Sequence, residues 1–207
     1  VRDATSASLL CFGKCEMVKH SVREELQGIL IFVGVVWFVF LAGLLAPIDI
    51  KSFGVTPRSL IGLGGILLMP FLHEDLKHLV SNSVPLTILL TLLAGSKANS
   101  WAIVIYIVVI GGTLLWLFGR PATHIGASGL VYGLIAFLLV SGFLERRAWP
   151  LAISILVGFL YGGTLLSGII PDLGSHVSWE GHLFGVVAGG MTAGLVTKRS
   201  RLKEASS

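Results

Sequence analysis

The chain has 207 residues, of which 54% are hydrophobic and only 13% are charged. A soluble domain carries about 25% charged residues, and a disordered chain needs low hydrophobicity, so the composition excludes both classes. The net charge of +4 does not indicate a nucleic-acid partner, because the basic residues lie in short segments between apolar runs, where they set membrane topology. The continuous apolar runs predict an all-α polytopic membrane protein rather than a transmembrane β-barrel.

The first predicted element is a cytoplasmic N-terminal segment, residues 1–27. Residues 1–16 are interpreted as an upstream extension or a leader without a structural role, because Met17 is a suitable start just before the first apolar run. Cys11 and Cys15, the two cysteines of the chain, both lie there, so no disulfide framework is expected. A metal site at this pair is disfavoured, because no further cysteine and no histidine cluster accompany it.

Six segments are apolar enough to span a bilayer, which takes about 20 residues each. An apolar run between the first and the second, residues 59–72, is too short to cross and is expected to be re-entrant or interfacial. The membrane domain covers residues 28–197, and a basic cytoplasmic tail, residues 198–207, follows it. The six predicted spans are residues 28–46, 75–95, 101–119, 127–144, 149–170 and 181–197.

The basic residues predict the orientation of these spans. An even number of spans puts both termini on one side, and cytoplasmic segments are enriched in Lys and Arg. With both termini in the cytoplasm, Lys51, Arg58, Lys77 and Arg120 lie on the opposite side, and the other 11 of the 15 basic residues are cytoplasmic. We therefore expect cytoplasmic termini, and the bare six-span layout without a targeting sequence indicates a prokaryotic inner membrane.

Polar residues of three spans lie near the same, non-cytoplasmic side. Ser128 is at the start of the fourth span, His182 is near the start of the sixth, and His78 and Asn82 lie in the first turns of the second. Polar groups within a membrane are costly and are functional candidates by default. These residues therefore predict one water-accessible pocket.

Ser128 lies in the sequence Gly126-Ala127-Ser128-Gly129, at a predicted helix N-terminus. Small neighbours leave its hydroxyl accessible, and the free backbone N–H groups favour a developing anion, which is the environment of an acyl-transfer nucleophile. The alternative is a helix N-cap, a position at which serine is common. The motif alone favours the N-cap.

His182 is a candidate base for that hydroxyl if the fourth and sixth spans pack closely. Glycine pairs at four-residue spacing on both spans favour such packing. The alternative is a histidine that is hydrogen-bonded inside a helix bundle and has no chemical role. The paired glycines are Gly129 and Gly133 on the fourth span and Gly185 and Gly189 on the sixth.

Three further residues are candidates for supporting roles. Tyr132 lies one helical turn after Ser128 and could pack against the His182 ring, the alternative being an ordinary core aromatic. His78 and Asn82 share a helix face and both donate hydrogen bonds, so they could form an oxyanion hole with the Ser128 N–H. His73, His78 and His182 are also candidate ligands of a metal ion. This alternative is disfavoured, because the sequence lacks the tight H-x-x-x-H spacing that is typical of metal sites.

Together these residues resemble the rhomboid family of intramembrane serine proteases. The resemblance covers roughly residues 29–198, and the order of its three motifs and their positions on the spans match the family. The chain departs from the usual pattern in Gly-Ala-Ser-Gly, where Gly-Leu-Ser-Gly is typical, and in residues 63–72, which lack the Trp-Arg pair of familiar bacterial members. The motifs are His73-Glu-Asp-Leu-Lys-His78-Leu-Val-Ser-Asn82, Gly126-Ala-Ser128-Gly129-x-x-Tyr132-Gly133 and His182-x-x-Gly185-x-x-x-Gly189.

The resemblance implies a six-helix bundle in the lipid bilayer that hydrolyses peptide bonds in or near the transmembrane segments of other membrane proteins. It implies a catalytic dyad of Ser128 and His182 without an acid partner or a cofactor, and a substrate gate formed by the fifth span and residues 171–179. The implied supporting residues are His78, Asn82 and the Ser128 N–H as the oxyanion hole, Tyr132 stacked under His182, Gly185 in the helix contact, and His73 in a structural role.

Two other functions are weighed against this one. A catalytically silent relative that binds and routes membrane proteins is disfavoured, because both Ser128 and His182 are present. A small transporter or channel is disfavoured, because the spans lack charged residues at mid-membrane and no inverted repeat is seen.

Overall fold

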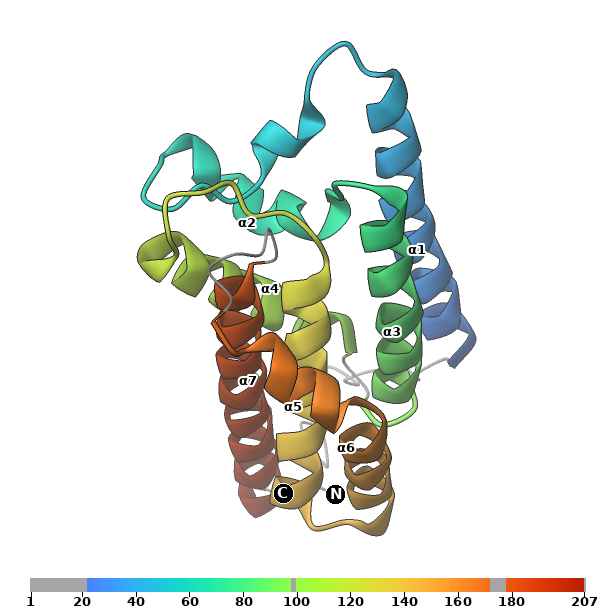
Figure 1. Cartoon of the computed structure of the whole chain (residues 1–207). Helices are drawn as coiled ribbons and strands as arrows, with labels where there is room; N and C mark the ends of the chain where they lie inside the picture. Colours follow the sequence, from blue (N-terminus) through green and yellow to red (C-terminus); the bar gives the residue numbers. More distant parts are fainter. Residues whose placement is uncertain (1–21, 98–99, 172–177, 207) are drawn as a thin grey trace, which may run out of the picture.

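The computed structural model describes residues 22–97, 100–171 and 178–206, and all regular secondary structure in this part of the chain is helical (Figure 1). The predicted all-α membrane bundle, with short helical turns between its first two long helices, is confirmed. The long helices are α1 (Val22–Leu45), α3 (Leu76–Ala94), α4 (Ser100–Phe118), α5 (Ser128–Glu145), α6 (Ala148–Gly168) and α7 (Trp179–Ser206). The short ones are η1 (Ile50–Phe53), η2 (Ile61–Leu63), α2 (Gly65–Leu68) and η3 (Met69–Phe71).

Five of the described helices, α1 and α3 to α6, are long and apolar enough to cross a membrane. The sixth predicted span lies in α7, which is not among the five because its many glycines and His182 make it less apolar. Helix α7 nevertheless lies beside α5 along the bundle (Figure 1). It also continues to Ser206, so most of the predicted basic tail is helical.

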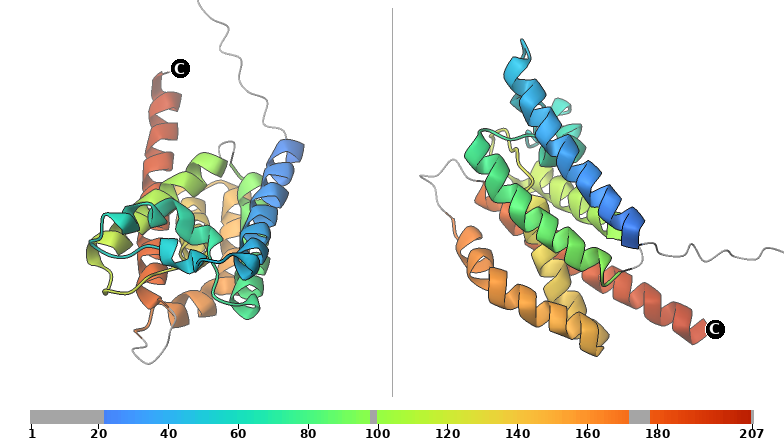
Figure 2. Two further views of the ribbon diagram at one scale, coloured as in Figure 1. Left: turned by 90° about the horizontal axis from the view of Figure 1, so that it is seen from above. Right: turned by 90° about the vertical axis from the view of Figure 1, so that its right-hand side faces the viewer.

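Helix α5 forms the centre of the bundle and packs against α3, α4, α6 and α7, whereas α1 lies at the edge beside α3 (Figure 2). It is the most buried of the five candidate spans, and Leu134, Ile135 and Phe137 are fully buried. A helix that is apolar on all sides is expected at such a position. The residue at the start of α5 is therefore held by neighbours on several sides.

The segment between α1 and α3 covers one end of the bundle. As its length predicts, residues 59–72 form only short helices, which pack on α4 and α1 and do not span. Val55 exchanges backbone hydrogen bonds with His124, at 2.9 and 2.8 Å, in the loop between α4 and α5. The Arg58 guanidinium donates to the carbonyls of Leu117 and Gly119 at the end of α4, so the segment is anchored to that end.

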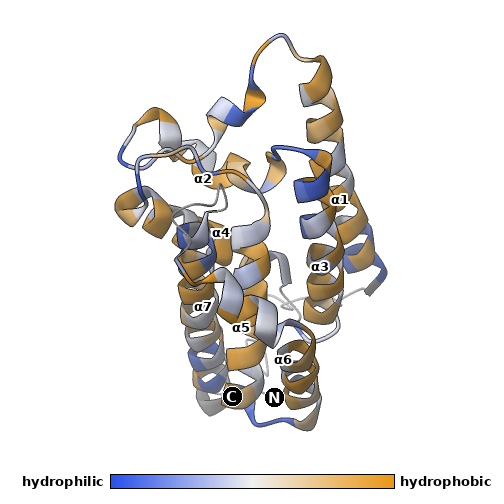
Figure 3. Ribbon diagram, in the orientation of Figure 1, coloured by the Kyte–Doolittle hydropathy of each residue, from blue (hydrophilic) through white to orange (hydrophobic). Residues whose placement is uncertain are grey.

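The opposite end of the bundle also carries hydrophilic segments (Figure 3). Lys97 pairs with Glu145, and the Ser100 hydroxyl donates to the Glu25 carboxylate. These contacts link the start of α4 to α1 and the end of α3 to the end of α5. The predictions for residues 1–16, Cys11 and Cys15, and for most of the 171–179 loop, lie outside the described residues.

Candidate active site

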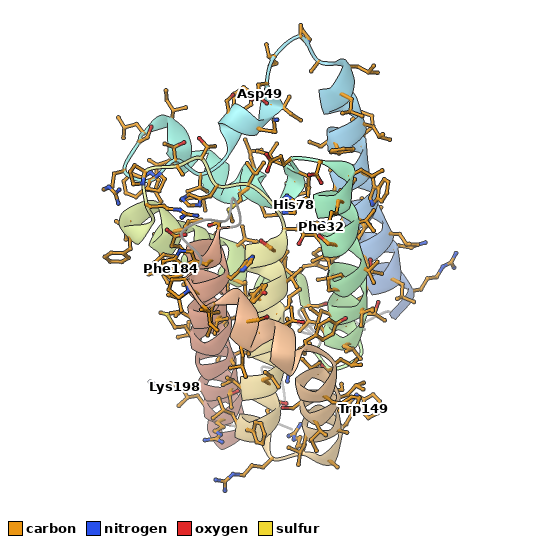
Figure 4. The ribbon with its side chains drawn as sticks, viewed as in Figure 1. Phe32, Asp49, His78, Trp149, Phe184 and Lys198 are labelled. Carbon is orange, nitrogen blue, oxygen red and sulfur yellow. The ribbon has the colours of Figure 1, made fainter. Side chains whose placement is uncertain are left out.

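A cavity of about 1230 Å³ lies at the end of the bundle where α3, α5 and α7 begin. Polar side chains from three distant parts of the sequence line it, together with parts of α6 and of the loop before α5. His78 is labelled at the start of α3 in Figure 4. The predicted site residues that line this one cavity are His78, Asn82, Ser128, Tyr132 and His182.

Ser128 is the first residue of α5, and the N-cap is Ala127. The interpretation of Ser128 as a capping side chain is therefore wrong, and its hydroxyl is left for another role. Gly126 has φ +112°, a conformation that favours glycine, and its N–H donates to the Met69 carbonyl at 3.0 Å. This turn presents Ser128 to the cavity, with the free N–H groups of a helix N-terminus around it.

His182 has a defined ring orientation. Its Nδ1 lies 2.9 Å from the Gly168 carbonyl oxygen, which can only accept, so Nδ1 carries the proton and Nε2 keeps a lone pair. The ring stacks on Tyr132 with a centroid distance of 4.0 Å and an interplanar angle of 4°. The Tyr132 hydroxyl donates to the Thr164 carbonyl at 3.0 Å. A histidine in this tautomer can take a proton at Nε2.

Paired glycines bring the turns of Ser128 and His182 together. A Cβ added to Gly185 would collide with the Gly129 carbonyl, and one on Gly189 would collide with the Gly133 carbonyl. One on Gly129 would lie 3.2 Å from the Gly181 carbonyl oxygen. The backbones of α5 and α7 are thus in direct contact at the residues that adjoin Ser128 and His182.

His78 and Asn82 lie in the first two turns of α3, whose N-cap Asp75 accepts from the His78 N–H at 2.7 Å. A Cβ on Gly126 would lie 2.7 Å from His78 Nε2 and 3.6 Å from Asn82 Nδ2, so both side chains face the turn before Ser128. Asn82 Nδ2 is buried and has no hydrogen-bond partner among the described residues. Donors without a partner beside a nucleophile are what a developing oxyanion requires.

His73 lies behind His78 rather than in the cavity lining. The two rings meet edge to face, with a centroid distance of 5.0 Å. Burial lowers the pKa of His73 to about 4, and the neighbouring His78 adds to this lowering. The His73 ring is therefore neutral at physiological pH, and it limits the orientations of the ring in front of it.

The two α6 carbonyls that hold His182 and Tyr132 were not predicted from the sequence. Gly168 and Thr164 contribute through their backbones, and a main-chain carbonyl has no signature in a sequence. The histidine at position 124 also lines the cavity, and its spacing of four residues before Ser128 is a signal that could have singled it out.

Comparison with known proteins places the chain in a family. A model of the rhomboid domain matches residues 62–199. An uncharacterized protein of Mycobacterium tuberculosis is 42% identical over 183 residues, which cover 84% of this chain and 75% of that protein. An uncharacterized protein of Mycobacterium leprae is 39% identical over 191 residues, which cover 86% of this chain and 75% of that protein.

A protein of Acanthamoeba polyphaga mimivirus that is named as a rhomboid protein is 30% identical over 129 residues, 59% of this chain and 69% of that protein. No solved structure matches the chain. The family model covers two thirds of the sequence, including every predicted site residue, and five helices are apolar enough to span a membrane. The chain is therefore an integral membrane protein and belongs to the rhomboid family.

Proposed function

We propose that the protein is a serine endopeptidase that hydrolyses peptide bonds in or near the transmembrane segments of other membrane proteins. The observation that carries this proposal is the state of His182, whose Nδ1–H is bound by the Gly168 carbonyl while its ring stacks on Tyr132 beside a cavity that also contains Ser128. A histidine held in this way is a ready general base.

The chemistry follows from these groups. His182 Nε2 takes the proton of the Ser128 hydroxyl, and Oγ attacks the carbonyl carbon of the scissile peptide. The oxyanion accepts hydrogen bonds from the Ser128 N–H and from the side chains of His78 and Asn82. His182 then gives its proton to the leaving nitrogen, the peptide bond breaks, and an ester to Ser128 remains. A water molecule, deprotonated by His182, hydrolyses that ester.

The shape of the cavity favours a substrate that arrives from the bilayer. Val84 and Pro85 of α3 and Tyr161 and Thr164 of α6 line it, and α6 packs along α5 rather than along α3. A transmembrane segment entering between α3 and α6 would reach Ser128 with little exposure to water. Its backbone must be extended at the scissile bond, so helix-breaking residues there should favour cleavage.

The charge distribution supports an orientation for the site. The cavity lies at the end of the bundle opposite the basic residues of α7 and of the α5–α6 connection. Because basic segments stay in the cytoplasm, the cavity would open to the non-cytoplasmic side. The mycobacterial relatives favour a prokaryotic plasma membrane.

Cleavage of a purified single-span substrate in detergent tests the proposal. The wild type should cleave, Ser128→Ala and His182→Ala should not, and Ser141→Ala, a buried serine at the far end of α5, should cleave like the wild type. Cleavage by Ser128→Ala would contradict the proposal. A wild type that neither cleaves nor reacts with a fluorophosphonate would instead favour a catalytically silent rhomboid.

A further inference from the structure

A polar cluster in the cavity wall connects the loop before α5 to the start of α7. Its four residues are Arg120 and His124 of the loop and Ser178 and Glu180 at the start of α7. His124 is 3% exposed and Glu180 is 6% exposed, so these two side chains are buried in the folded chain. The dyad chemistry does not use any of them directly.

The hydrogen bonds in this cluster have a defined direction. His124 Nε2 lies 3.2 Å from the Arg120 carbonyl oxygen, so Nε2 carries the proton and Nδ1 is an acceptor. Ser178 Oγ lies 2.7 Å from Nδ1 and therefore donates its hydroxyl proton to the ring. The same Oγ accepts from the Gly181 N–H at 3.1 Å, as a helix-capping serine does.

Burial lowers the pKa of His124, although its bond to the Arg120 carbonyl and the nearby Glu180 oppose this effect. The ring is accordingly neutral at physiological pH, as the donor and acceptor pattern requires. The Arg120–Glu180 ion pair, at 3.3 Å, connects the same two segments a second time.

The positions of the two bonded residues relate directly to the dyad. His124 lies four residues before Ser128, and Ser178 lies four residues before His182. The His182 N–H donates to the Ser178 carbonyl at 3.2 Å, and the His124 backbone is fixed by its two bonds to Val55. The His124–Ser178 hydrogen bond therefore joins the two segments that carry the nucleophile and the base, four residues before each of them.

We infer that His124 is a positioning residue of the active site, which holds the start of α7, and with it His182, in register with Ser128 through its hydrogen bond to Ser178. This inference rests on the proposed function, because positioning has a catalytic consequence only if the dyad is active. A small misplacement of reacting groups costs about 10²-fold in rate, so loss of this bond should lower kcat rather than raise KM.

Three substitutions of His124 separate positioning from packing. His124→Asn retains an acceptor where Nδ1 stands and should keep most of kcat. His124→Gln retains only a donor toward the Arg120 carbonyl, and His124→Phe keeps the ring volume alone. The Gln and Phe variants should both lower kcat about 10- to 100-fold with KM unchanged. Fluorophosphonate labelling of Ser128 should likewise be close to the wild-type rate in His124→Asn and slower in His124→Gln and His124→Phe.

Substitutions of Ser178 test the same hydrogen bond through its other partner. They keep the inference testable if a His124 variant does not fold. Ser178→Thr retains the hydroxyl and should stay active, Ser178→Ala should not, and the double variant His124→Phe/Ser178→Ala should be no worse than the more impaired single variant. Thermal unfolding of each variant, measured alongside, separates lost activity from lost structure.

An equal loss in His124→Asn and His124→Phe, or a raised KM at unchanged kcat, would overturn the inference. Wild-type rates in all His124 variants would overturn it while leaving the proposed function intact. A wild-type protein that neither cleaves nor is labelled would count against the proposed function itself.

Discussion

At the scale of single residues, His182 is oriented by a main-chain carbonyl rather than by a carboxylate. A carboxylate in that position would be a buried charge, which is expensive in a low-dielectric interior unless it is well paired. The Gly168 carbonyl selects the same tautomer without that cost. It offers less stabilisation to a protonated ring, so the oxyanion donors become more important for the rate.

Replacing Asn82 by Ala tests the oxyanion donors. Removing one such donor typically lowers kcat ~10²–10³-fold, and we expect a loss in this range. The unfolding temperature should not fall, because Asn82 Nδ2 has no partner among the described residues and its removal breaks no folded-state bond. Steady-state kinetics and thermal unfolding measure both effects. Thr91→Val, on the same helix but away from the cavity, is the control, and an unchanged kcat in Asn82→Ala would reject this role.

At the scale of helices, the contact between α5 and α7 brings the two halves of the site together. It depends on glycines whose missing side chains let two backbones meet. Helix α6 adds the carbonyls that hold Tyr132 and His182, so three helices must be in register for one base to be oriented.

Gly185→Ala tests this contact, with Gly190→Ala as the matched control on α7. A Cβ at position 185 would collide with the Gly129 carbonyl, whereas one at position 190 meets open space. Overpacking of this kind typically costs ~1–3 kcal/mol, and the displaced dyad should lose most of its activity. Gly190→Ala should match the wild type in activity and thermal unfolding. Equal behaviour of the two variants would mean that the close contact is unimportant.

The sequence predicted the helices and most of the candidate site, because apolar runs and local motifs are properties of neighbouring residues. Ser128, His182, His78 and Asn82 were found from polar residues near the ends of spans, and they line one cavity. The role of the Gly168 carbonyl depends on how α6 meets α7 and cannot be seen in a local pattern. The N-cap alternative for Ser128 failed because the helix starts at Ser128 itself, after the turn at Gly126, which is one residue earlier than a capping serine requires.

At the scale of the whole molecule, the polar cavity lies at one end and most of the basic residues lie at the other. Apolar side chains cover the outside of the helices, where lipid would contact them, and the polar residues of the site line a cavity at one end. The basic residues at the other end include Arg23, Lys97, Arg146, Arg147, Lys198, Arg199 and Arg201.

The stability of the molecule should fall in acid through His73. Its folded pKa of about 4 lies below the ordinary value of 6.5, so the unfolded chain binds a proton that the folded chain does not. The stabilisation is complete above pH 6.5 and is lost as the pH falls toward 4, by ~3 kcal/mol at most from this group. Thermal unfolding in detergent across this range should show a steeper loss for the wild type than for His73→Phe. Parallel curves would contradict the assignment.

The proposed function depends above all on Ser128 being a nucleophile that His182 activates. Reaction of the purified protein with a fluorophosphonate probe, followed by mass spectrometry of its peptides, tests this most directly, because it needs no knowledge of the natural substrate. We expect one adduct, on Ser128, that is lost in Ser128→Ala and forms much more slowly in His182→Ala, whereas Ser141→Ala should be labelled at the wild-type rate. An adduct on another residue, or labelling of Ser128 at the same rate without His182, would contradict it.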